Sequence, residues 1–157
     1  MQSLVPNSKM IYRIEISETQ RAQVMRHLAS DVSREHGGFL MGRITASGTT
    51  RVTSIEDIVA CPDAPGSMEF LTFTPDCWQL AHTHPRLGED EFRIVGWYHS
   101  HPGMHTRMSR QDEWLHSNFF SDCSFVAWIH DPIEGTHSYW RWDESSPKEF
   151  DSTKVVS

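Results

Sequence analysis

Apolar and polar residues alternate near the start of the chain. In residues 12–16 one tyrosine and two isoleucines alternate with charged residues, and this period of two predicts a half-buried strand. Ser17 follows and begins an S-x-x-Q pattern, which is typical of a helix N-terminus. Apolar residues then recur at helical spacing, so we expect a helix over residues 18–33. The positions that define its apolar face are Ala22, Met25, Ala29 and Val32.

Short apolar runs bounded by turn residues make up most of the remaining chain. Gly37 and Gly38 are expected to break the first helix, and Pro75 is expected in the first turn of a short helix. The strands predicted after the first are residues 39–44, 51–60, 68–73, 92–98, 125–129 and 137–142, and the further helices are residues 75–82 and 110–120. Residues 61–67 and 86–91 are predicted to be loops, and residues 143–157 a frayed polar tail.

The order of these elements predicts an α+β fold. A strand and a helix come first, and several strands, a helix and further strands follow, which favours one mixed, mostly antiparallel sheet flanked by helices. A chain of 157 residues suits a single domain and can bury a core without disulfide support.

Charge and apolar content exclude several classes of partner. The chain has 14 Lys and Arg residues against 21 Asp and Glu residues, a net charge of −7, which argues against nucleic acid because its affinity rests on basic contacts to phosphate. No apolar run approaches the ~20 residues of a membrane span, and residues 1–10 lack a signal-peptide pattern. The three cysteines, Cys61, Cys77 and Cys123, form no C-x-x-C pair and are expected to be free thiols. We therefore expect a cytoplasmic protein without a nucleic-acid or membrane partner.

Two of the ten histidines lie two residues apart at the end of a predicted strand. His99 and His101 should project from one face of that strand, about 6–7 Å apart along the backbone, and their imidazoles can converge on one ion. Seven residues separate His101 from Ser109, and if Ser109 begins a helix, Asp112 lies on the same face of its first turn. Two imidazoles and one carboxylate suit zinc, and three protein ligands leave a fourth position open, as in catalytic zinc sites.

A catalytic zinc site also needs a general base. The best candidate is Glu35, a charged residue between the first helix and the apolar strand that follows it. Spacing alone does not bring Glu35 to the metal.

These residues resemble the JAMM motif of the JAB1/MPN/Mov34 metalloprotease family. The motif is a glutamate, here Glu35, then the sequence His99-Ser100-His101-Pro102, and then Ser109 and Asp112 at S-x-x-D spacing. Residues 35–42, 96–98 and 126–132 also resemble the family, and the resemblance spans residues 10–142, which we take as the domain, with residues 143–157 as a tail.

The resemblance implies both a fold and an activity. It implies a single MPN/JAB-like domain with a cytidine-deaminase-like fold. One zinc ion would be held by His99, His101 and Asp112, Glu35 would be the base, and Ser109 would donate a hydrogen bond to the oxyanion of the reaction. Active members cleave the peptide or isopeptide bond after the C-terminal glycine of ubiquitin or a ubiquitin-like protein. Short bacterial JAB-type enzymes work beside ubiquitin-like conjugation or sulfur-carrier systems, so the expected partners are a ubiquitin-like protein or its conjugate and the activating and conjugating enzymes of that pathway.

Three other functions are alternatives for this chain. A sulfur-carrier hydrolase would release a small adduct such as cysteine from a Gly-Gly tail, and a non-catalytic scaffold would use the fold alone, although such members typically lack a ligand or the base. A metal phosphoesterase usually needs further carboxylate ligands for a second metal ion. The S-x-x-D pattern is also a helix capping box, so a purely structural role for Ser109 and Asp112 is the alternative at that position.

Several residues near the motif have plainer interpretations. The segment from His82 to Pro85 repeats the H-T-H-P pattern, but Phe92 and Val95 occupy its later positions and cannot bind metal, so it is interpreted as a helix end. His105 and His116 are expected at the surface or in support of a ligand, and Trp97, Tyr98, Trp128 and Trp140 in the core. Trp114 is a candidate for lining a substrate groove, and residues 61–67 lie where the family often inserts a substrate-gripping segment.

Overall fold

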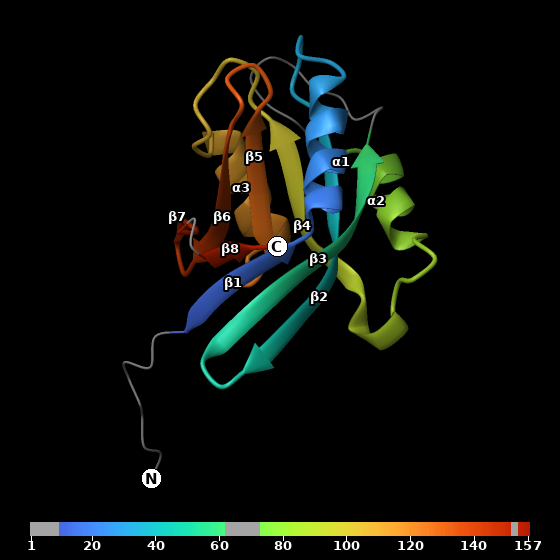
Figure 1. Ribbon diagram of the computed structural model, residues 1–157, viewed down its shortest axis with the longest axis vertical. Helices are drawn as coiled ribbons and strands as arrows, with labels where there is room; N and C mark the ends of the chain where they lie inside the picture. Colours follow the sequence, from blue (N-terminus) through green and yellow to red (C-terminus); the bar gives the residue numbers. More distant parts are fainter. Residues whose placement is uncertain (1–9, 62–72, 152–153) are drawn as a thin grey trace.

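A single twisted sheet with helices on both faces forms the protein (Figure 1). The computed structural model describes residues 10–61, 73–151 and 154–157. Its elements are β1 (Ile11–Ile16), α1 (Glu18–Ala29), β2 (Gly37–Ser47), β3 (Thr50–Cys61), α2 (Pro75–His82), a 3₁₀ turn (Glu89–Glu91), β4 (Arg93–Ser100), α3 (Arg110–Phe119), β5 (Val126–Asp131), β6 (Thr136–Asp143), β7 (Ser146–Glu149) and β8 (Val155–Val156).

The strand order is β7-β6-β5-β4-β2-β3-β1-β8. Three neighbouring pairs, β4 with β5, β1 with β3 and β1 with β8, are parallel, and the other four are antiparallel. The predicted α+β fold with a mixed, mostly antiparallel sheet is therefore confirmed. The parallel pair β4 and β5 is joined through α3, since parallel neighbours need a crossover connection.

Each face of the sheet has its own hydrophobic core. Because side chains alternate along a strand, Trp97 of β4 packs with α2 and α3, whereas Tyr98 packs on the opposite face with α1. Val24 and Leu28 are the buried residues of α1, and Leu115 is the apolar buried residue of α3. The two cores fix both sides of β4, the strand that leads into the histidine motif.

The first helix differs from its prediction. Ser17 caps it as expected, with Oγ accepting the Gln20 N–H at 3.1 Å. It ends at Ala29, four residues before the predicted end, because Asp31 folds back and accepts the Ser33 N–H at 2.9 Å, a turn that competes with the helix. The predicted apolar face is wrong at three of its four positions, because Ala22, Ala29 and Val32 are exposed. Met25 is partly buried against the core, and Val24 and Leu28 are the buried residues.

The glycine pair predicted to break the first helix instead begins β2. Gly37 lies opposite His99 in the ladder between β2 and β4. A Cβ atom on Gly37 would lie 2.0 Å from the Tyr98 carbonyl oxygen, so only glycine allows this approach.

The prediction of a frayed end is also wrong. β7 pairs with β6, β8 pairs with β1, and Phe150 between them is buried. Short polar edge strands carry no apolar alternation of their own, and pairing with the rest of the sheet defines them. The short helix at residues 75–82 is confirmed, whereas most of the predicted loop at 61–67 and strand at 68–73 lie outside the described residues.

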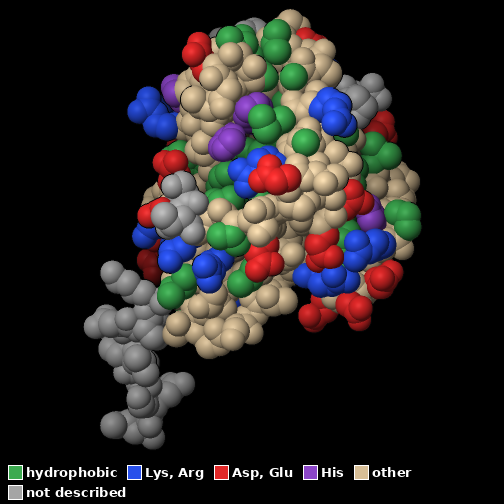
Figure 2. Space-filling model, in the orientation of Figure 1, with side chains coloured by type: hydrophobic (Ala, Val, Ile, Leu, Met, Phe, Trp, Pro, Cys, Tyr) green, Lys and Arg blue, Asp and Glu red, His purple; other side chains and the backbone are tan. Residues whose placement is uncertain are grey.

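Figure 2 shows the charged side chains on one face of the protein. Acidic and basic side chains lie beside one another on this face, mostly over its middle and lower part. Among the described residues the longest helix has 12 residues, and no helix has the length and apolar character of a membrane span.

Candidate metal centre

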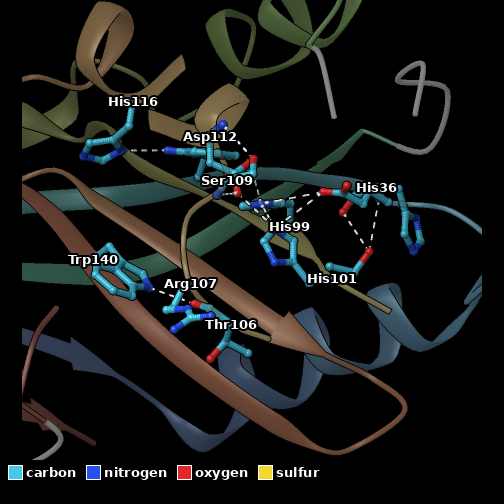
Figure 3. A network of polar contacts seen from close by, with 12 residues as sticks. His36, His99, His101, Thr106, Arg107, Ser109, Asp112, His116 and Trp140 are labelled. Carbon is cyan, nitrogen blue, oxygen red and sulfur yellow. Dashed lines mark hydrogen bonds and ion pairs between the residues drawn. The ribbon is translucent and has the colours of Figure 1, made fainter. Parts of the chain in front are cut away.

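The end of β4 and the start of β2 meet at one edge of the sheet. His99 is the second-last residue of β4, and His101 follows the strand and donates its N–H to the His130 carbonyl at 2.9 Å, which continues the pairing with β5. Both imidazoles are fully buried and face each other, with 3.0 Å between their Nε2 atoms (Figure 3). The predicted convergence of the two rings is therefore present.

Helix α3 begins beside these histidines. Ser109 is its N-cap, and its Oγ accepts the Asp112 N–H at 3.1 Å, while Asp112 Oδ2 accepts the Ser109 N–H at 2.9 Å. This reciprocal capping box fixes the rotamer of Asp112. The structural and the metal-binding interpretations of the S-x-x-D pattern are thus compatible at this position.

Asp112 reaches both histidines. Its Oδ1 lies 3.0 Å from His99 Nε2, and its Oδ2 lies 2.9 Å from His101 Nε2. Atoms bound tetrahedrally to one zinc ion at about 2.0–2.1 Å lie about 3.3 Å from one another, close to this arrangement. Because the three residues are buried and their donor atoms converge, the set fits a divalent metal ion.

Glu35 completes a buried group of four. Its Oε1 lies 3.6 Å from His101 Nε2 and 3.9 Å from His99 Nε2, and one donor atom from each of the four residues lies within 4.8 Å of the others. Glu35 is held there through its neighbour: Ser100 N–H donates to the His36 carbonyl at 3.0 Å, and His36 N–H donates to Ser100 Oγ at 3.2 Å. The residue between the two histidines therefore ties the Glu35 segment to the end of β4.

Burial and mutual attraction set the protonation of this group. Burial lowers the pKa of His99, which favours the neutral imidazole that a metal ion requires. Burial acts against the charged form of Asp112, but the two adjacent imidazoles outweigh it and hold the pKa of Asp112 below its ordinary value. Burial likewise opposes protonation of His101, but the bond to Asp112 raises its pKa overall.

Residues around the group support it from outside. The His101 Nδ1–H donates a hydrogen bond to the His105 carbonyl at 2.8 Å, so Nε2 is the ring nitrogen that could coordinate a metal ion. Asp131 is fully buried, and its Oδ1 accepts the Gly103 N–H at 2.9 Å, which ties down the turn after His101. The bond of Asp131 to Gly103 and that of Ser100 to His36 join segments far apart in the chain, and no local pattern predicts such contacts.

The remaining candidates have other surroundings. In the repeated H-T-H-P segment, His84 Nε2 lies 2.7 Å from Asp57 Oδ2. Helix α2 ends at His82, so the segment is a helix end, as predicted. His116 is buried, and burial lowers its pKa to about 3. Trp114 is 54% exposed on α3 and packs against Phe119.

Comparison with known proteins places the chain in a family. Residues 17–142 match the family described as prokaryotic homologues of the JAB domain. The chain belongs to this prokaryotic JAB family. JAB proteins include metalloproteases with the JAMM motif as well as inactive members. Membership therefore identifies the domain, and the residues of the site must be used to argue for activity.

Several eukaryotic proteins are also similar in sequence to this chain. An uncharacterised protein of Caenorhabditis elegans is 30% identical over 124 residues, covering 77% of this chain and 37% of that protein. The 26S proteasome non-ATPase regulatory subunit 14 of Dictyostelium discoideum is 28% identical over 123 residues, covering 77% and 39%. A 26S proteasome regulatory subunit of Schizosaccharomyces pombe is 29% identical over 135 residues, covering 85% and 42%. The chain thus spans about two fifths of the length of these relatives.

A solved structure shares the JAB fold of this chain. A protein from Desulfitobacterium hafniense superposes with a TM-score of 0.66, is 20% identical, and matches 92% of each chain. At this identity the likeness shows the fold alone.

Proposed function

We propose that this chain is a zinc-dependent metallopeptidase that hydrolyses the peptide or isopeptide bond after the C-terminal glycine of a ubiquitin-like protein. The observation that carries the proposal is the convergence of His99, His101 and Asp112 beside Glu35 in a JAB-family chain. The resemblance to JAMM enzymes supports the substrate class, and the proteasome regulatory subunits among the relatives are consistent with it. We assign the activity to residues 10–142.

The metal ligands in this proposal are His99, His101 and Asp112. Two neutral imidazoles and one ionised carboxylate suit a single divalent ion of borderline softness. Zinc held by three protein ligands would leave a position for water or substrate, lower the pKa of that water and polarise the scissile carbonyl.

Glu35 is the proton carrier in this proposal. Its Oε1 lies farther from the imidazole nitrogens, at 3.6 and 3.9 Å, than Asp112 does, at 2.9 and 3.0 Å. A carboxylate beside the ligands can take a proton from the attacking water and pass it to the leaving amine.

Ser109 is the proposed donor to the oxyanion. Its Oγ accepts the Asp112 N–H and donates to no acceptor among the described residues, so its own proton is available to a substrate. A preorganised donor of this kind stabilises charge as it develops on the carbonyl oxygen.

The test of the mechanism is hydrolysis of a ubiquitin-like protein joined through its C-terminal glycine to lysine. Zinc-loaded Glu35→Gln should keep one zinc ion per chain and lose activity by about a hundredfold or more, since the proton carrier is removed while the ligands remain. Glu15→Gln, at an exposed position on β1, is the matched control and should act like the wild type. Undiminished hydrolysis by pure Glu35→Gln protein would refute the assigned role of Glu35.

The test of the substrate class is capture in the native cell. Glu35→Ala retains the three proposed ligands, so substrate should accumulate on it, and mass spectrometry identifies what is bound. Protein conjugates would support deconjugation, and a precursor extended beyond its glycine would support maturation. A small adduct on a Gly-Gly tail would favour the sulfur-carrier hydrolase instead.

A further inference from the structure

The two histidines of the metal centre are oriented in different ways. A metal-binding imidazole almost always donates its second ring N–H to a carbonyl or carboxylate, and this bond fixes the ring plane. His101 has such a bond, from Nδ1 to the His105 carbonyl at 2.8 Å. Within the described part of the chain, His99 Nδ1 is buried and has no hydrogen-bond partner. Another contact must therefore set the plane of the His99 ring.

The contact is an indole lying flat on the imidazole. Trp97 precedes His99 by two residues on β4, so both side chains project from the same face of the sheet. Their rings are stacked with 4.4 Å between centroids and 10° between planes. Both residues are fully buried, so the stack is confined on all sides.

The indole is fixed in turn by helix α3. Trp97 Nε1–H donates to His116 Nδ1 at 2.9 Å. His116 is fully buried and follows Asp112 by four residues, on the same face of α3. One helix therefore carries both the carboxylate of the centre and the anchor for the indole.

We propose that Trp97 is a positioning residue that holds His99 in its metal-binding orientation by ring stacking, with His116 as its anchor. The stack replaces the outer hydrogen bond that His99 lacks. This inference rests on the proposed zinc site, and it assigns roles to two residues outside the motif. Helix α3 would then set the orientation of two ligands, Asp112 directly and His99 through the indole.

The experiment measures the zinc dissociation constant by competition with a chromophoric chelator. Trp97→Leu removes the stack and should weaken zinc binding roughly 10- to 100-fold, the usual effect of losing an outer support of a ligand. Trp97→Phe keeps a ring but loses the N–H, and His116→Leu loses the acceptor, so both should fall between Trp97→Leu and the wild type. His116→Asn places a carbonyl oxygen near the position of Nδ1 and should restore binding to within about threefold of the wild type.

A matched control separates positioning from general loss of packing. Trp128 is equally buried, lies on β5 and packs in the core on the opposite face, so Trp128→Leu should bind zinc within about threefold of the wild type. Equal zinc affinity in folded Trp97→Leu and wild type, or equal losses in Trp97→Leu and Trp128→Leu, would overturn the role of Trp97. If the wild type itself binds no zinc, the proposed metal site fails and the positioning role fails with it.

A second measurement needs neither zinc nor a folded variant at Trp97. In the metal-free wild type, the ring-current field of the indole should shift the carbon-bound ring protons of His99 upfield in the NMR spectrum. Ordinary shifts for these protons would contradict the stacked orientation.

Discussion

Asp131 offers a quantitative test of how the turn after His101 is held. The carboxylate is fully buried at the end of β5, and its Oδ1 accepts three backbone N–H groups, from Gly103 at 2.9 Å, Ile133 at 2.9 Å and Glu134 at 3.2 Å. Gly103 adopts a positive φ of 69°, so its N–H can be held this way only while the turn keeps its shape. We expect Asp131→Ala to destabilise the protein and loosen His101 together.

The magnitude follows from the number and kind of bonds. Each hydrogen bond to a charged group contributes about 1.5 kcal/mol or more, so three contribute about 4–5 kcal/mol. Water can reach the exposed turn and compensate part of the loss, so Asp131→Ala should cost about 3 kcal/mol. Asp131→Asn keeps an acceptor without its charge and should cost about 1–2 kcal/mol.

Urea unfolding of the metal-free protein measures both values. A loss of 3 kcal/mol in a chain of this size corresponds to a Tm lower by roughly 6–12 °C. Glu134→Ala, exposed in the same turn and retaining its backbone N–H, is the control and should stay within about 0.5 kcal/mol of the wild type. Zinc affinity of Asp131→Ala should fall about tenfold, as for loss of an outer support.

The pH dependence gives a further check on Asp131. Burial acts against its charged form, but the three N–H donors outweigh burial and lower the pKa of Asp131. A depressed carboxyl pKa contributes stability above its unfolded value of about 3.9, and this stability is lost as the pH falls through the folded value. The difference between wild type and Asp131→Asn should therefore shrink below about pH 4. Free energies of unfolding within 0.5 kcal/mol of the wild type for both Asp131 variants at pH 7 would refute this reasoning.

Three other predictions follow from single residues. Ser109→Ala should keep its zinc but hydrolyse substrate about 10²- to 10³-fold more slowly in steady-state kinetics, because the oxyanion donor is lost. It should also lose about 1 kcal/mol of unfolding free energy in urea, because the helix cap is lost. Unchanged kinetics would contradict the donor role. Burial holds the pKa of His116 at about 3, so the stability that its neutral form provides is complete above pH 6.5 and is lost as the pH falls toward 3. In His116→Asn the slope of unfolding free energy against pH between 6.5 and 4 should be smaller by about 1.4 kcal/mol per unit, and identical slopes would show that His116 is not buried as a neutral ring. His84→Ala should keep a full equivalent of zinc by metal analysis, because His84 pairs with Asp57 outside the centre, and a loss of zinc would show that the second H-T-H-P segment takes part.

Strand alternation and the helix-capping pattern predicted the parts of the site that lie within one segment of the chain. The period of two along β4 placed His99 on the face that also carries His101 after the strand ends, and the capping pattern placed Asp112 beside Ser109. The position of Glu35 depends on β2 pairing with β4, and a pairing 64 residues apart in the chain, such as that of His36 with Ser100, has no signature in spacing. Only the resemblance to the JAMM motif supplied that link.

The errors have the same physical origin. The helix end at Ala29 depended on Asp31 competing for a backbone N–H, and the apolar face of α1 was decided by contact with the sheet. The C-terminal strands β7 and β8 are defined by their neighbours β6 and β1 rather than by their own residues. Tertiary contact overrides local preference in each case.

The central claim is that His99, His101 and Asp112 hold one zinc ion and that Glu35 is not a ligand. Metal analysis of purified wild type, His99→Ala, His101→Ala, Asp112→Ala and Glu35→Gln tests it directly. We expect one zinc ion per chain in the wild type and in Glu35→Gln, and less than about a tenth of a zinc ion per chain in each of the three ligand variants. A full equivalent of zinc in a folded ligand variant, or its loss from folded Glu35→Gln, would contradict the assignment.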